Sequence, residues 1–101
     1  MAGKPIEFHE EAAAEYEAAF AWYFERSRLA ASKFADELDE AIDQISHSPR
    51  RWPNHIRGTR KFLLTHFPFL VVYRDLPSSV QVVAIVHGHR RPGYWKERLA
   101  E

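Results

Sequence analysis

Hydrophobic residues recur every three or four positions over the first half of the chain. Between residues 10 and 26 they predict one amphipathic helix, built on Ala12, Tyr16, Ala19, Phe20 and Tyr23. Between residues 29 and 46 they predict a second helix, built on Ala31, Phe34, Leu38, Ala41, Ile42 and Ile45. Only Ser27 and Arg28 separate the two patterns, and so short a connection predicts an antiparallel helical hairpin.

Alternating apolar and polar positions predict four strands, a short one at the start and three in the second half. They comprise residues 5–8, 60–66, 69–74 and 80–87. Turn-forming residues at 67–68 and 75–79 separate the last three strands, which predicts an antiparallel meander. Residues 49–58 are typical of a loop, and residues 93–99 have room for one or two helical turns.

Helices followed by strands are typical of an α+β fold. We expect the antiparallel hairpin to pack on one face of a mainly antiparallel four-stranded sheet. The N-terminal strand must pair with the meander because its backbone groups need partners, and the sequence does not fix which edge it takes. With 101 residues, of which 46% are hydrophobic, residues 1–101 are predicted to form one domain with its own core.

Composition excludes several functional classes. The chain contains no cysteine, so neither disulfides nor thiol chemistry is expected. No apolar stretch approaches the roughly 20 residues that span a bilayer, and residues 1–5 have no signal-type apolar core, so we expect a cytoplasmic protein without membrane contact. Its four glycines do not form a phosphate-binding GxGxxG or GxxxxGK loop. Nucleophilic triads and paired-carboxylate sites are not apparent either.

A net charge of zero conceals a division of charge along the chain. Residues 1–48 contain 11 acidic and 4 basic side chains, and residues 49–101 contain 3 acidic and 10 basic, so the halves carry about −7 and +7. The basic half includes the segment HGHRRPGYW at 87–95, directly after an apolar strand. Guanidinium groups and aromatic rings there suit RNA or an acidic protein surface. Alternatively, half of these arginines pair with the acidic helices of their own domain.

The aromatic residues of the first helix cannot all lie on one face. Trp22 projects nearly opposite to Phe20 and Phe24, given the rotation of about 100° per residue. Either the hairpin is covered on several sides, or Trp22 lies flat on the surface, as single apolar residues often do. The third interpretation is a docking surface for another chain, because aromatic residues concentrate at interfaces.

Histidines near the end of the last strand raise the question of a metal. His87 and His89 point to the same side of a strand, and with His66 or His55 they would supply three imidazole ligands. No carboxylate or cysteine stands at ligand spacing in that segment, and histidines at strand ends commonly serve as hydrogen-bonding groups. We therefore assign neither a metal nor a cofactor.

The order of elements, together with several short motifs, resembles the RelE/ParE superfamily of toxins from bacterial type II toxin–antitoxin modules. The motifs are FHEEA at 8–12, AWY at 21–23, ISHSP at 45–49, RWP at 51–53, FPF at 67–69, VYR at 72–74 and HGHRR at 87–91. They are more similar to the ParE, or plasmid-stabilisation, branch than to RelE. The resemblance implies neutralisation by a cognate ParD-like antitoxin in a hetero-oligomer, for which Trp22, Tyr23 and Phe24 are the candidate contacts.

The ParE-like branch implies a toxin that inhibits DNA gyrase by protein contact, without chemistry of its own. It also implies a basic C-terminal region for that contact. The candidate target-binding residues are Arg60, Arg74, His89, Arg90, Arg91, Tyr94 and Trp95.

The alternative is a ribosome-dependent mRNA endoribonuclease of the RelE kind. Those members carry an arginine three residues before the tyrosine of the third strand, where this chain has Leu70. Cleavage needs a base, a cation and an acid. The candidates are His87 or His89 as base, Arg60 or Arg91 as cation, and Tyr94 or the other histidine as acid. A further alternative is an inactive relic that still binds an antitoxin.

Overall fold

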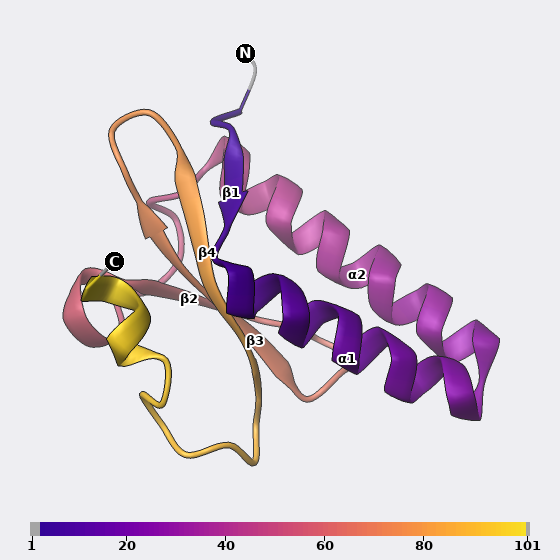
Figure 1. The fold of residues 1–101 in the computed structure, drawn as a ribbon. Helices are drawn as coiled ribbons and strands as arrows, with labels where there is room; N and C mark the ends of the chain where they lie inside the picture. The colour runs from indigo at the N-terminus through magenta and orange to yellow at the C-terminus, as the bar shows by residue number, and fades with distance from the viewer. Residues whose placement is uncertain (1–2, 101) are drawn as a thin grey trace.

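The computed structural model describes residues 3–100; residues 1, 2 and 101 of the predicted domain lie outside the described residues. Its elements are β1 (Ile6–Phe8), α1 (Glu10–Arg26), α2 (Arg28–His47), the 3₁₀ helix η1 (Ile56–Gly58), β2 (Arg60–Leu63), β3 (Phe69–Asp75), β4 (Val80–His87) and the 3₁₀ helix η2 (Lys96–Ala100) (Figure 1). The predicted helices and strands up to residue 87 are confirmed with their ends within one residue, apart from β2.

The strand β2 ends at Leu63 instead of continuing to His66 as predicted. The carboxylate of Glu37 on α2 accepts hydrogen bonds from the backbone N–H groups of Thr65, at 2.5 Å, and His66, at 3.1 Å. Because these donors are bound by a side chain of α2, they do not extend the strand. An alternating pattern alone cannot reveal such a competing partner.

The four strands form one mixed sheet in the order β1-β4-β3-β2. The pairs β2–β3 and β3–β4 are antiparallel, which confirms the predicted meander. The N-terminal strand β1 takes the edge beside β4 and runs parallel to it, with Ile6 opposite Val80 and Phe8 opposite Val82. Because β1 is so short, β4 has no strand partner on this edge beyond Val82 among the residues that the structure describes.

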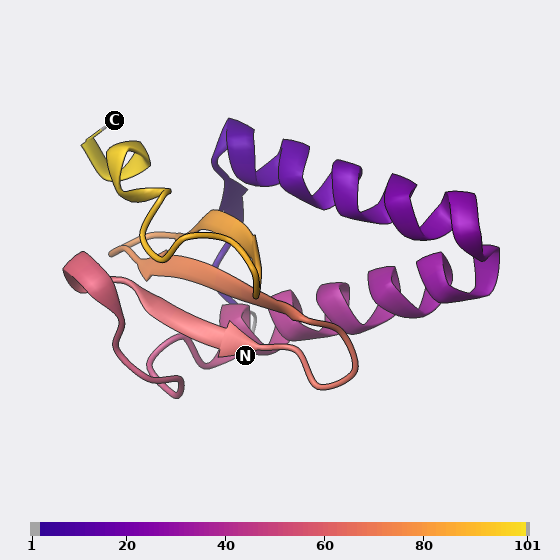
Figure 2. The same cartoon turned by 90° about the horizontal axis from the view of Figure 1, so that it is seen from below.

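The helical hairpin covers one face of the sheet, and Figure 2 shows α1 and α2 side by side. Ser27 ends α1 and begins α2, because its backbone N–H donates to the Tyr23 carbonyl and its side chain accepts from the N–H of Ala30. Phe34 and Leu38 of α2 pack with residues of β3 and β4 in this core. The predicted α+β arrangement of a hairpin on a four-stranded sheet is therefore confirmed.

The C-terminal segment covers the opposite face of the sheet (Figure 1). Trp95 is only 1% exposed and packs in a second core cluster with Val72, Val83 and Val86. The ring of His55 lies 5.7 Å from that of Trp95. Trp95 therefore anchors the segment to the sheet. Its ring is buried by its own domain, so this structure does not present Trp95, a candidate target-binding residue, to a partner.

None of the helices within the described residues is both long enough and apolar enough to cross a membrane.

We expect Trp95→Ala to lower the free energy of unfolding by about 3–5 kcal/mol, because it leaves a large cavity in the second core cluster. Trp22→Ala is the matched control, since Trp22 is 53% exposed and its truncation should cost less than about 1 kcal/mol. Urea denaturation of both variants measures the difference. Equal losses would contradict the anchoring role of Trp95.

Candidate functional site

A surface groove of about 520 Å³ lies between α1, the end of β4 and the segment after β4. Small side chains of α1, Ala18 and Ala19, line it, beside Trp22 and Tyr23. The sheet contributes Phe69, Ile85 and His87; Pro68, Glu15, Arg90 and Tyr94 complete the lining. We call this the α1 groove. It lies where β4 extends beyond the short strand β1.

Glu15 of α1 and Arg98 of η2 hold the walls of the groove together. The two residues form a bidentate ion pair, with Nη1 to Oε1 at 2.8 Å and Nη2 to Oε2 at 3.0 Å. Glu15 also accepts from the Ile85 N–H at 3.0 Å, and Arg98 donates to the Val83 carbonyl at 3.0 Å. These side chains thus bind backbone groups of β4 beyond the end of β1.

The charges in this pair are fixed by their surroundings. Burial raises the pKa of Glu15, but hydrogen bonds from Arg98, Tyr94 and Ile85 outweigh burial and leave that pKa below its ordinary value. Burial lowers the pKa of Arg98, and the nearby Glu15 carboxylate more than compensates, so its pKa is raised. Glu15 is therefore anionic and Arg98 cationic at neutral pH.

The hydroxyl of Tyr94 donates to Glu15 at 2.5 Å. Burial raises the pKa of Tyr94, and the hydrogen bond to the Glu15 carboxylate raises it further. Tyr94 is therefore a neutral phenol whose proton is already engaged. Its ring supports the guanidinium of Arg90, whose Cζ lies 4.0 Å from the ring centroid.

The loop after β4 presents three exposed cationic or ionisable side chains, His89, Arg90 and Arg91. The rings of His87 and His89 stack at 5.1 Å, and the His89 N–H donates to Nδ1 of His87 at 3.1 Å. Sequence analysis selected these neighbours together, and the structure does bring them together. We call residues 89–91 the cationic loop.

Arg60 lies far from the cationic loop. It stands opposite Tyr73 on β3, whereas His87 stands opposite Phe69, and a further strand separates β2 from β4. Arg60 and His87 are four residues apart along the strands and two strand spacings apart across the sheet. Their backbones are therefore roughly 16 Å apart. The guanidinium of Arg60 donates to the Trp52 carbonyl at 2.7 Å. The expectation that Arg60 shares a site with His87 is therefore wrong.

Most basic residues after Pro49 do not pair with the acidic helices. Within residues 3–100, Arg98 is the one that does, with Glu15 at 2.8 Å and Glu11 at 3.6 Å. Arg50 approaches Asp75 at 4.0 Å, and Arg74 donates through Nε to the Gln81 side chain at 2.9 Å. No ion pair within the same range involves Arg57, Lys61, Arg90, Arg91 or Lys96. The alternative of internal neutralisation therefore holds for Arg98 and fails for the cationic loop.

The other histidines do not join His87 and His89. His66 contacts the Glu37 carboxylate through Nδ1 at 2.8 Å, and His55 lies against Trp95. Among the residues that the structure describes, no three potential metal ligands cluster together.

The three aromatic residues proposed as docking contacts differ in exposure. Trp22 and Phe24 are exposed, and the guanidinium carbon of Arg26 lies 3.7 Å from the Trp22 ring centroid. Tyr23 packs into the main core, with its ring 5.2 Å from that of Phe34, and also lines the α1 groove. In this structure the hairpin is covered at Tyr23, while Trp22 lies exposed on the surface.

Sequence analysis missed Glu15 and Arg98 as residues that shape the site. Glu15 stands three residues after Ala12 and four before Ala19, both buried, so the helical period already places a carboxylate on the buried side of α1. A buried carboxylate needs a cation or several donors. The sequence offers ten cations in the second half, and nothing in the pattern singles out Arg98.

Comparison with known proteins places this architecture among small bacterial toxins. The sequence profile of the family described as "ParE toxin of type II toxin-antitoxin system, parDE" matches residues 6–92, and the chain belongs to this family. A solved structure titled "Chromosomal ParDE TA system from P. aeruginosa" has the same fold, with a TM-score of 0.73 at 19% identity over 83% of this chain and 95% of that chain. The search of curated proteins found no match.

We expect Glu15→Gln to lower the free energy of unfolding by about 2–3 kcal/mol at neutral pH, because it leaves the largely buried Arg98 without its main counter-ion. The matched control is Glu11→Gln, since Glu11 is 66% exposed and its loss should cost less than about 0.5 kcal/mol. Urea denaturation of the two variants and the parent measures both costs.

The pH dependence of stability provides a second test with the same variant. The pKa of Glu15 is lower in the folded state than in the unfolded chain. Its contribution to the free energy of unfolding is therefore fully present above the unfolded pKa of about 4.3, and it is lost as the pH falls through the folded pKa. The difference in free energy of unfolding between the parent and Glu15→Gln should therefore become smaller below about pH 4. A difference that stays constant as the pH falls well below that value would contradict this assignment.

Proposed function

We propose that this ParE-family protein inhibits DNA gyrase by direct contact through the cationic loop, and that a cognate antitoxin neutralises it by covering the α1 groove and Trp22. Membership of the ParE toxin family supports a toxin of a type II toxin–antitoxin system. Gyrase as the target follows from the resemblance to the ParE branch. The exposed cations Arg90 and Arg91, which form no ion pair within residues 3–100, suit an acidic surface of a protein target.

Two observations favour protein contact over RNA cleavage: Arg60, one of the two cation candidates, lies away from the histidines, and the acid candidate Tyr94 is already engaged. The strand register and spacing place the backbone of Arg60 about 16 Å from the backbone of His87. The proton of Tyr94 is engaged by Glu15, and the raised pKa makes this phenol a poor acid at neutral pH. Leu70, where RelE-like enzymes carry an arginine, packs against the second core cluster.

The α1 groove favours a partner that brings apolar side chains. Its walls combine alanines with exposed Trp22, and aromatic side chains of this kind anchor protein interfaces. The outer face of α2 is acidic, so a partner that wraps the hairpin would need basic residues there. A disordered antitoxin segment that folds on binding meets both requirements and covers a large area.

We expect the purified toxin to accumulate cleaved DNA complexes with gyrase and plasmid, and to leave messages intact on translating ribosomes. His89→Ala and Arg91→Ala should each reduce growth inhibition and cleaved complexes at least about tenfold, because each removes a central contact. Arg28→Ala is the matched control, since Arg28 is an exposed cation at the start of α2, outside the cationic loop.

Each other outcome identifies an alternative. Site-specific cutting of messages would support the RelE-like endoribonuclease, and silence in both assays would support an inactive relic. Full toxicity of both variants would refute the assignment of the cationic loop as the contact.

We expect Trp22→Ala to weaken binding of the cognate antitoxin at least about tenfold, because truncation of a buried aromatic anchor commonly costs 2 kcal/mol or more. Leu29→Ala is the matched control: Leu29 is apolar and 66% exposed but does not line the α1 groove. Isothermal titration of the purified components measures both affinities. An unchanged affinity for Trp22→Ala, or an equal loss for Leu29→Ala, would contradict the proposed antitoxin site.

A further inference from the structure

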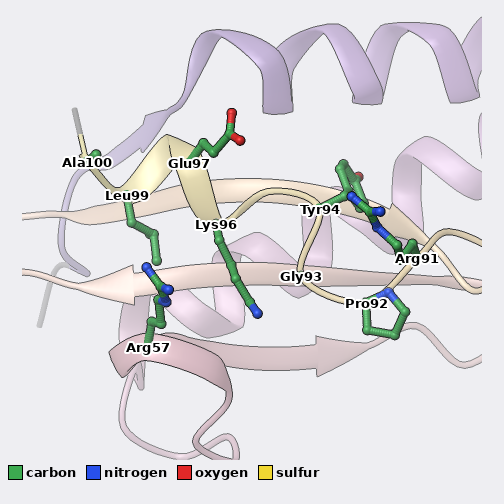
Figure 3. A pocket seen from close by; sticks show the side chains of 9 residues that line it. All are labelled: Arg57, Arg91, Pro92, Gly93, Tyr94, Lys96, Glu97, Leu99 and Ala100. Carbon is green, nitrogen blue, oxygen red and sulfur yellow. The ribbon is translucent and has the colours of Figure 1, made fainter.

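A second pocket, of about 690 Å³, lies between η1 and the C-terminal segment (Figure 3). Arg57 of η1, Arg91 and Lys96 contribute its positive charge, and Glu97 is the one acidic residue among the described residues that line it. We call this the η1 pocket. It shares Tyr94 with the α1 groove, whereas neighbouring arginines divide between the two: Arg90 lines the α1 groove and Arg91 the η1 pocket.

Within residues 3–100, the cations of the η1 pocket are not neutralised. In the part of the chain that the structure describes, Arg57, Arg91 and Lys96 take part in neither an ion pair nor a side-chain hydrogen bond. Figure 3 shows the side chains of Arg57 and Lys96 extending into the space between η1 and η2, while the Glu97 carboxylate points away from both. The pocket therefore offers an uncompensated positive charge to an anion.

The backbone around the pocket is specialised for this arrangement. Arg57 adopts φ 55° and ψ 44°, in the left-handed region that favours glycine, and the next residue, Gly58, also has a positive φ of 76°. A long cationic side chain thus stands at a position where glycine would be less strained. Such strain persists where the surroundings or the function require it.

Gly93 is required on the opposite wall. It has a φ of 75°, and a Cβ at this position would lie 2.5 Å from Cε of Lys96. The absence of a side chain at Gly93 therefore allows Lys96 to cross the turn and reach the pocket. Each wall therefore places a cation at or beside a residue with a positive φ.

We propose that the η1 pocket binds the phosphodiester backbone of DNA. Guanidinium groups bind phosphate oxygens bidentately, and a row of phosphates can meet several cations that project from separate elements. Base stacking is not expected, because Trp95 is buried and the Tyr94 ring is contacted by the guanidinium groups of Arg90 and Arg98. The chemistry therefore indicates contact with the backbone, without sequence preference.

This inference goes beyond the proposed contact with gyrase and does not depend on it. The full-length protein is titrated into a short labelled DNA duplex at increasing salt, and binding is followed by fluorescence anisotropy. Each phosphate contact contributes about −0.9 to the slope of log affinity against log salt. We expect Arg57→Gly and Lys96→Ala each to reduce the slope by about one contact and to weaken binding at low salt about tenfold.

The variants separate binding from folding. Arg57→Gly relieves the left-handed strain, so its thermal midpoint should stay equal or rise while DNA binding falls. Glu97→Gln should strengthen binding severalfold, because it removes the acidic side chain of the pocket. Arg28→Ala, which removes the same charge from an exposed site on α2, should leave DNA affinity nearly unchanged.

Unchanged DNA binding by Arg57→Gly would overturn the proposal, as would an equal loss in Arg28→Ala. Equal affinity for an acidic peptide of the same charge would also overturn it, since the pocket would then be a protein-binding site. Failure of the toxin on gyrase, with DNA binding still dependent on Arg57, would refute the proposed function and leave this inference intact.

Discussion

The ion pair between Glu15 and Arg98 determines where the functional surfaces lie. It joins α1 to the C-terminal segment across a separation of 83 residues and binds β4 where its strand partner has ended. Without it, two opposite charges would lie largely buried and uncompensated, which costs far more than the loss of an exposed pair. The position of Tyr94, and through it that of Arg90, follows from the same carboxylate.

The division of charge along the sequence becomes a division between surfaces in the fold. Most acidic residues of α2 remain on the outside of the hairpin, and four basic residues of the second half, Arg57, Arg90, Arg91 and Lys96, line the two pockets beside the C-terminal segment. One buried pair connects the two halves, and the cationic loop and the η1 pocket keep their charge. A near-zero net charge therefore coexists with two surfaces that attract opposite partners.

The fold could be predicted from periodicity and turn residues because hairpin and meander are local features of the sequence. The strand β2 and the placement of Arg60 were harder, since they depend on Glu37 and on strand register, which are long-range. The cationic loop was predicted because its residues are adjacent in sequence. The burial of Trp95 could not be predicted, because composition cannot distinguish an aromatic that binds a partner from one that anchors its own segment.

The amide of Ile85 has an unusual partner for a residue within a strand. It donates to a carboxylate oxygen of Glu15, not to the carbonyl of an adjacent strand. Because Glu15 stands on α1, movement of α1 away from β4 releases this hydrogen without separating the strands of the sheet. The solvent exchange of that single hydrogen therefore reports on the contact between α1 and β4, and distinguishes this local motion from global unfolding.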